Sequence, residues 1–74
     1  MEAAQHGEVA NLARMANQIA SFFHAYPDET ALQGVRDHIH AFWTRKMQAE
    51  LAAHAGELAL DPLVVRVLPG LERE

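Results

Sequence analysis

Five histidines are the side chains of this 74-residue sequence best suited to bind a metal or move a proton: His6, His24, His38, His40 and His54. A metal site on one helix needs ligands three or four residues apart, because successive helical residues are rotated by about 100°. His38 and His40 are two residues apart, and no two histidines have i, i+4 spacing. We therefore predict that the histidines bind no metal, and that His38 and His54, at the edges of apolar stripes, have structural roles.

The residue types needed for catalysis are scarce. The sequence has no cysteine, which excludes a thiolate nucleophile, a disulfide and a cysteine-based zinc site. Its single serine, Ser21, can approach His24 on a helix, but such a pair supplies neither an oxyanion hole nor a pocket. There is no glycine-rich phosphate loop. We predict that the chain is not an enzyme and that it holds no cofactor.

The composition indicates a water-soluble domain that does not bind nucleic acid. Half of the residues are hydrophobic, enough for a packed core, while ten acidic against six basic residues leave no clustered positive face for phosphates. The apolar runs are far shorter than the roughly 20 residues of a membrane span. Residues 1–7 lack the apolar segment of a signal peptide, so we expect a cytoplasmic protein that binds no membrane.

The first third of the chain has the spacing of an amphipathic helix. Alternating steps of three and four residues separate its apolar positions, which are Val9, Leu12, Ala16, Ile19, Phe23 and Tyr26. Pro27 disfavours helical geometry in the residue before it. The pattern predicts a helix over about residues 8–26.

Three further helices are predicted. Asp28-Glu29 suits the start of a helix over 28–43, whose apolar stripe is Leu32, Val35, Ile39, Phe42 and Trp43. Thr44 can cap a new helix, so we favour a break there and a third helix over 44–55, the alternative being one continuous helix. Asp61-Pro62 marks the start of a last helix over 62–68. Residues 1–7 and 69–74 are predicted to be flexible tails.

The expected fold is one all-α domain over residues 1–74, a small bundle of three to four helices in which the long first helix packs against an antiparallel second one. Gly34 interrupts the second helix, which indicates close packing of a neighbour. The amides of Asn17 and Gln18 differ in position: Asn17 is predicted to lie in solvent, nearly opposite Ile19, whereas Gln18 lies beside the apolar arc.

The apolar arc of the first helix is wider than one neighbouring helix covers. Met15 and Phe22 extend it to roughly 140°, against about 100° for a stripe facing a core. Either the bundle buries the whole arc, or Met15 and Phe22 face a partner. Aromatic residues and methionine are enriched at interface cores. We therefore name as candidate partner-binding residues Met15, Phe22 and Trp43, with Asn11 and Gln18 on the polar rim; self-association of the isolated chain is also possible.

Several segments together resemble the delta subunit of the molybdenum-dependent, NAD-dependent formate dehydrogenase of bacteria. They are Arg14–Ile19 with Phe22-Phe23, His38-Ile39 with Phe42-Trp43, and Met47, Leu51 and His54 with Asp61–Val64 downstream. The likeness extends over about residues 9–68. The resemblance implies that the molybdenum cofactor, iron–sulfur clusters, flavin and NAD belong to larger subunits, which are the expected partners.

Two functions are compatible with this resemblance. One is a non-catalytic subunit that docks onto the larger subunits and supports assembly or stability. The alternative is a free-standing maturation or regulatory factor that binds the enzyme transiently. Nothing in the sequence separates them, and nothing in it identifies the contact surface on the partner.

Overall fold

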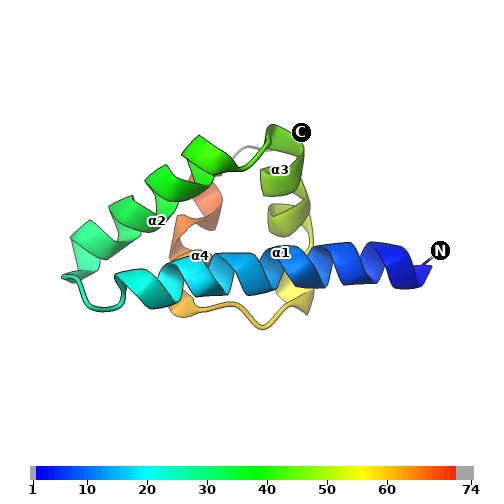
Figure 1. Ribbon diagram of the computed structural model, residues 1–74, viewed down its shortest axis with the longest axis horizontal. Helices are drawn as coiled ribbons and strands as arrows, with labels where there is room; N and C mark the ends of the chain where they lie inside the picture. Colours follow the sequence, from blue (N-terminus) through cyan, green and yellow to red (C-terminus); the bar gives the residue numbers. More distant parts are fainter. Residues whose placement is uncertain (1, 72–74) are drawn as a thin grey trace.

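A computed structural model describes the backbone of residues 2–71 and the side chains of residues 8–71. Within that range the protein is all-helical, which confirms the expected fold class. The elements, in order, are α1 (Glu2–Phe23), α2 (Asp28–Phe42), α3 (Arg45–Ala53), the 3-10 turn η1 (Ala55–Glu57), α4 (Pro62–Val67) and the 3-10 turn η2 (Leu68–Gly70). α2 returns along α1 and diverges from it, and α3 and α4 fill the widening space between the two long helices (Figure 1).

Small residues allow α1 and α2 to pack closely near the turn that joins them. Ala16 and Ala20 of α1 and Ala31 of α2 are buried. At Gly34 a Cβ atom would overlap the ring of Phe23, so the glycine provides the space that this ring occupies. The close neighbour expected from the mid-helix glycine is therefore Phe23.

The chain breaks between α2 and α3, as favoured from Thr44. The Oγ1 of Thr44 accepts a hydrogen bond of 3.1 Å from the Met47 N–H and caps α3. Trp43 has extended backbone geometry and is buried. The buried Gln48 side chain donates from Nε2 to the Trp43 carbonyl at 3.2 Å, which ties the start of α3 to the end of α2.

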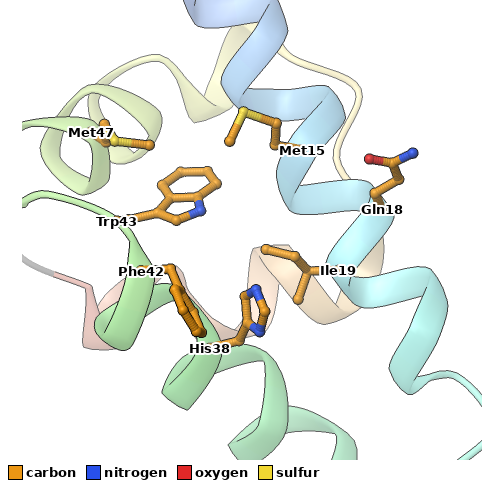
Figure 2. A pocket seen from close by; sticks show the side chains of 7 residues that line it. All are labelled: Met15, Gln18, Ile19, His38, Phe42, Trp43 and Met47. Atoms are coloured by element: carbon orange, nitrogen blue, oxygen red, sulfur yellow. The ribbon is translucent and has the colours of Figure 1, made fainter.

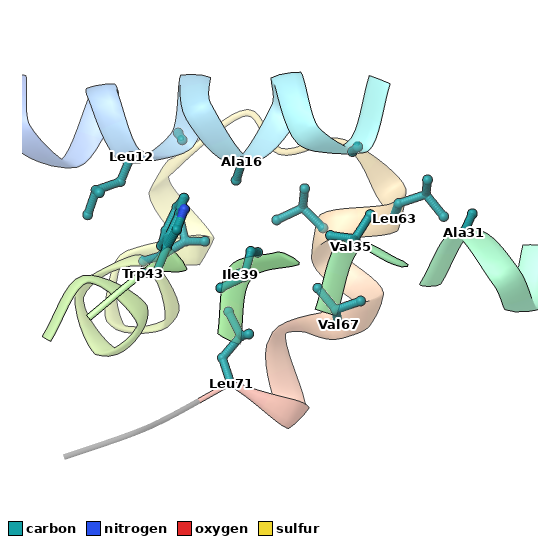
Figure 3. Close-up of a cluster of buried hydrophobic side chains, with 13 residues drawn as sticks. Leu12, Ala16, Ala31, Val35, Ile39, Trp43, Leu63, Val67 and Leu71 are labelled. Atoms are coloured by element: carbon teal, nitrogen blue, oxygen red, sulfur yellow. The ribbon is translucent and has the colours of Figure 1, made fainter. Parts of the chain in front are cut away.

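α4 packs against both α2 and α1 and closes the core between them (Figure 1). Asp61 accepts a hydrogen bond from the Leu63 N–H at 2.9 Å and caps α4, the start that Asp61-Pro62 predicts. An ion pair of 2.7 Å between Arg66 and Asp28 links the exposed side of α4 to the start of α2. The core is one cluster contributed by all four α-helices and by the segment after η2 (Figure 3). Its members include Leu12, Ala16, Val35, Ile39, Trp43, Leu51, Leu63, Val64, Val67 and Leu71.

The helix bounds differ from the expected ones at both ends of α1. The helix begins at Glu2 rather than near residue 8, so residues 2–7 are helical. Glu2, Ala3, Ala4 and Gln5 are good helix formers without an apolar period, which is why a search for apolar spacing misses them. The helix ends at Phe23 rather than Tyr26, and Tyr26 is half exposed.

The expected tail after residue 68 also differs. η2 brings the chain back against α2, and Leu71 is buried in the core. The His40 ring contacts the Gly70 carbonyl at 3.1 Å and helps to hold this segment. The predicted flexibility of residue 1 and residues 72–74 lies outside the described residues.

Candidate functional site

An open, mostly apolar groove of about 610 Å³ lies between α1 and the end of α2. Its walls come from three helices and from the α2–α3 junction, and Figure 2 shows their side chains turned towards a common space. We call it the α1–α2 groove, defined by Met15, Gln18, Ile19, His38, Phe42, Trp43 and Met47. Four of the seven are methionine, phenylalanine or tryptophan, residue types enriched at interface cores.

Trp43 links this groove to the core. The side chain is only 6 % exposed and belongs to the core cluster, yet it also lines the groove. In Figure 2 the indole ring lies between the side chains of Met15 and Met47, with its nitrogen on the side that faces α1. The groove floor is therefore fixed by the same residue that holds α2 and α3 together.

The candidate binding residues named from the sequence do not all lie together. Met15, Gln18 and Trp43 line the groove, with Met15 half-buried and Gln18 exposed. Phe22 is 67 % exposed and packs edge-on against Phe23 at a centroid distance of 5.1 Å, at the end of α1 and outside the groove lining. Asn11 is exposed, also outside the lining, and hydrogen-bonds Arg14.

Phe42 belongs to the apolar stripe predicted for the second helix, but it is not part of the core. The side chain is 73 % exposed and lies at the groove edge, where its ring packs against His38 at a centroid distance of 4.7 Å. The helix ends at Phe42. Because the backbone of Trp43 is extended, the Trp43 side chain points into the core and the Phe42 side chain does not. Phe42 is a groove residue that apolar spacing alone does not distinguish from the core residues of the stripe.

A polar cluster on the other side of α1 fixes the loop before α4. The Asn17 amide donates from Nδ2 to the Ala59 carbonyl at 2.9 Å, and its Oδ1 accepts from the Asp61 N–H at 2.8 Å. The predicted solvent position of Asn17 is thus wrong: the side chain is half-buried because the loop 58–61 passes over it. Long-range hydrogen bonds of this kind leave no signal in local spacing.

His24 joins the same cluster. Its Nε2 lies 2.7 Å from Oδ2 of Asp61. The His24 ring is therefore bound to the loop before α4 and does not form a pair with Ser21. Burial acts to raise the pKa of Asp61, but the hydrogen bonds from His24 and the Leu63 N–H, together with the charge of His24, outweigh it and hold this pKa below its usual value. The cluster is an electrostatic clamp between the end of α1 and the start of α4.

We expect this clamp to lose its contribution to stability in acid. Because the pKa of Asp61 is lowered in the folded chain, the carboxylate stabilises the fold above its unfolded value of about 3.9 and ceases to do so as the pH falls through the folded value. Asp61→Asn keeps a capping oxygen and removes the charge. Urea unfolding of both chains at pH 7 and pH 3 should show a difference in free energy of unfolding that is larger at pH 7. A difference independent of pH would contradict this role of Asp61.

The other histidines are dispersed. His54 lies at the end of α3, 3.4 Å from Oε1 of Glu57, and His40 contacts the Gly70 carbonyl. Among the described residues no three histidine, aspartate or glutamate side chains gather as a metal site. The absence of bound metal remains a prediction. Among these residues there is also no helix with both the length and the apolar character needed to cross a bilayer.

Comparison with known proteins places this arrangement in one family. The family model of the NADH-dependent formate dehydrogenase delta subunit, FdsD, matches residues 11–68, well over half of the chain. This range contains every residue of the groove and of the Asn17–His24–Asp61 cluster. No curated protein and no solved structure matches. The chain belongs to the formate dehydrogenase delta subunit family.

Proposed function

We propose that this protein is a non-catalytic subunit that docks onto the larger subunits of a cytoplasmic formate dehydrogenase and supports their assembly or stability. The observation that carries the proposal is the family match over residues 11–68. In this proposal the molybdenum cofactor, the iron–sulfur clusters, the flavin and the NAD site all belong to the larger subunits.

The roles of the polar side chains support a structural rather than a catalytic function. His24, Asp61 and Asn17 bind one another or the loop between α3 and α4. His40 and His54 contact a carbonyl and a carboxylate of nearby turns. These contacts position helices. The α1–α2 groove, by contrast, offers apolar surface of the kind that protein partners cover.

Deletion of the gene tests the proposal. Formate-dependent NAD reduction and the amounts of the larger subunits should both fall in the deletion strain and return when the gene is restored. A stoichiometric subunit should also elute with the enzyme in gel filtration, whereas a transient maturation factor should not. Unchanged enzyme amount and activity after deletion would contradict a role in assembly or stability.

A further inference from the structure

The indole N–H of Trp43 is a hydrogen-bond donor that lies at the α1–α2 groove. A buried tryptophan N–H usually has an acceptor. The Trp43 carbonyl accepts from Gln48, but among the residues that the structure describes no acceptor is bound to the indole Nε1–H. The atom is not sealed in the core, since the described residues include no fully buried, unpaired side-chain nitrogen. The indole ring lines the α1–α2 groove, and its nitrogen is on the side of the ring that faces α1 (Figure 2).

The walls around this donor define what fits beside it. Met15 and Met47 lie on either side of the indole, and Ile19 and Phe42 are the other apolar residues of the open groove. Methionine side chains adapt to the shape of an inserted apolar group. Gln18 and His38 are the polar side chains of the lining, and the only described contact of the His38 ring is with Phe42. An occupant must therefore combine a large apolar side chain with a hydrogen-bond acceptor placed next to it.

We propose that the α1–α2 groove is the surface that receives a larger formate dehydrogenase subunit, through a segment that inserts a large apolar side chain between Met15 and Met47 and presents an oxygen acceptor to the Trp43 indole N–H. This inference rests on the proposed function, because membership of a delta subunit family supplies a larger subunit as the partner. A second copy of the chain would bring together two molecules that each carry a net charge of -4. The family match supplies the partner, and the indole donor and the apolar walls set the chemistry of the segment that fits the groove.

Variants of two neighbouring residues separate the two parts of the proposal. Phe42→Ser removes an apolar wall at a position 73 % exposed, where the fold does not depend on the side chain. Trp43→Phe keeps an aromatic ring in the core, removes the N–H donor and also removes part of the ring volume at this buried position. Val65→Ser is the matched control, because Val65 is also an exposed apolar residue but lies on α4, outside the groove lining.

The experiment titrates each full-length chain into formate dehydrogenase purified from the deletion strain and measures the dissociation constant. Phe42→Ser should weaken binding by about 30-fold or more, as for an interface anchor. Trp43→Phe should weaken it by about three- to tenfold, the loss of one hydrogen bond. Val65→Ser should bind as the parent chain does. Melting curves of the free variants come first, and Phe42→Ser still tests the groove if Trp43→Phe fails to fold.

The remaining outcomes overturn the inference in distinguishable ways. If the parent chain binds the enzyme and both groove variants bind equally well, docking uses another surface and the proposed function stands. If the parent chain does not bind the enzyme, the proposed function fails as well. If the free parent chain is a dimer in gel filtration, Phe42→Ser dissociates it and enzyme binding is unchanged, the groove is a self-association surface instead.

Discussion

Trp43→Ala should unfold the free chain. The side chain is 6 % exposed, packs with the core cluster and fills the corner between α2 and α3. Truncating a buried tryptophan costs about 3–5 kcal/mol. A core of this size supplies about 3–5 kcal/mol in total. Circular dichroism at 222 nm should therefore show no cooperative melt at temperatures where the parent chain is folded.

Phe22→Ala is the control for Trp43→Ala, because it truncates an exposed aromatic residue instead of a buried one. Phe22 is 67 % exposed, so its truncation should change the free energy of unfolding by no more than about 0.5 kcal/mol. If Phe22 is an interface anchor, as predicted from the width of the arc, the variant should fold normally and lose affinity for formate dehydrogenase. Met15→Ala should fall between the two, because Met15 is half-buried. A Trp43→Ala chain that melts like its parent would show that the α2–α3 corner does not depend on this residue.

The helices themselves follow from local signals. Steps of three and four between apolar residues give α1 and α2 their buried faces, and Thr44 and Asp61 cap the helices that follow them. Gly34 indicated a close neighbour, and the structure identifies it as Phe23. Each signal is read from a single residue or from residues within one or two helical turns of one another, although the neighbour that fills the space at Gly34 lies on another helix.

The parts that the sequence did not reveal depend on contacts between distant segments. Asn17 is half-buried only because the loop 58–61 passes over it. Gln48 is buried because its amide reaches back to the Trp43 carbonyl. Leu71 reaches the core through η2.

Only part of the α1–α2 groove could be predicted from the sequence, because its two walls come from different helices. Met15 and Gln18 were identified as edge residues of α1, and the structure places them on one wall of the groove. The opposite wall contains His38, placed at the edge of the apolar stripe, and Phe42. The exposure of Phe42 is decided by the end of α2 and by the extended backbone of Trp43. Helical periodicity extends the apolar stripe to the last residue of a predicted helix. It does not predict which side chain points into the core where the helix ends.

Asn17 and Gln18 give the sharpest test of these long-range contacts, because they are adjacent residues with the same functional group and opposite roles. The Asn17 amide bonds the Ala59 carbonyl and the Asp61 N–H. Asn17→Ala removes the hydrogen bonds to the Ala59 carbonyl and the Asp61 N–H. The loop that carries Asp61, the N-cap of α4, is then held less firmly. The Asp61 N–H is half-buried and the Ala59 carbonyl is exposed to water, so only the first is left unpaired. We therefore expect a loss of about 1–2 kcal/mol in the free energy of unfolding.

Gln18→Ala is the matched control, because it removes the neighbouring amide at an exposed position on the groove side of α1. Its free energy of unfolding should stay within about 0.5 kcal/mol of the parent chain. Urea unfolding monitored by circular dichroism measures both variants under one condition. Equal losses from the two would mean that only the helix propensity at these positions matters and that the Asn17 clamp contributes nothing. A large loss from Asn17→Ala alone would establish that the start of α4 is held by a side chain from α1.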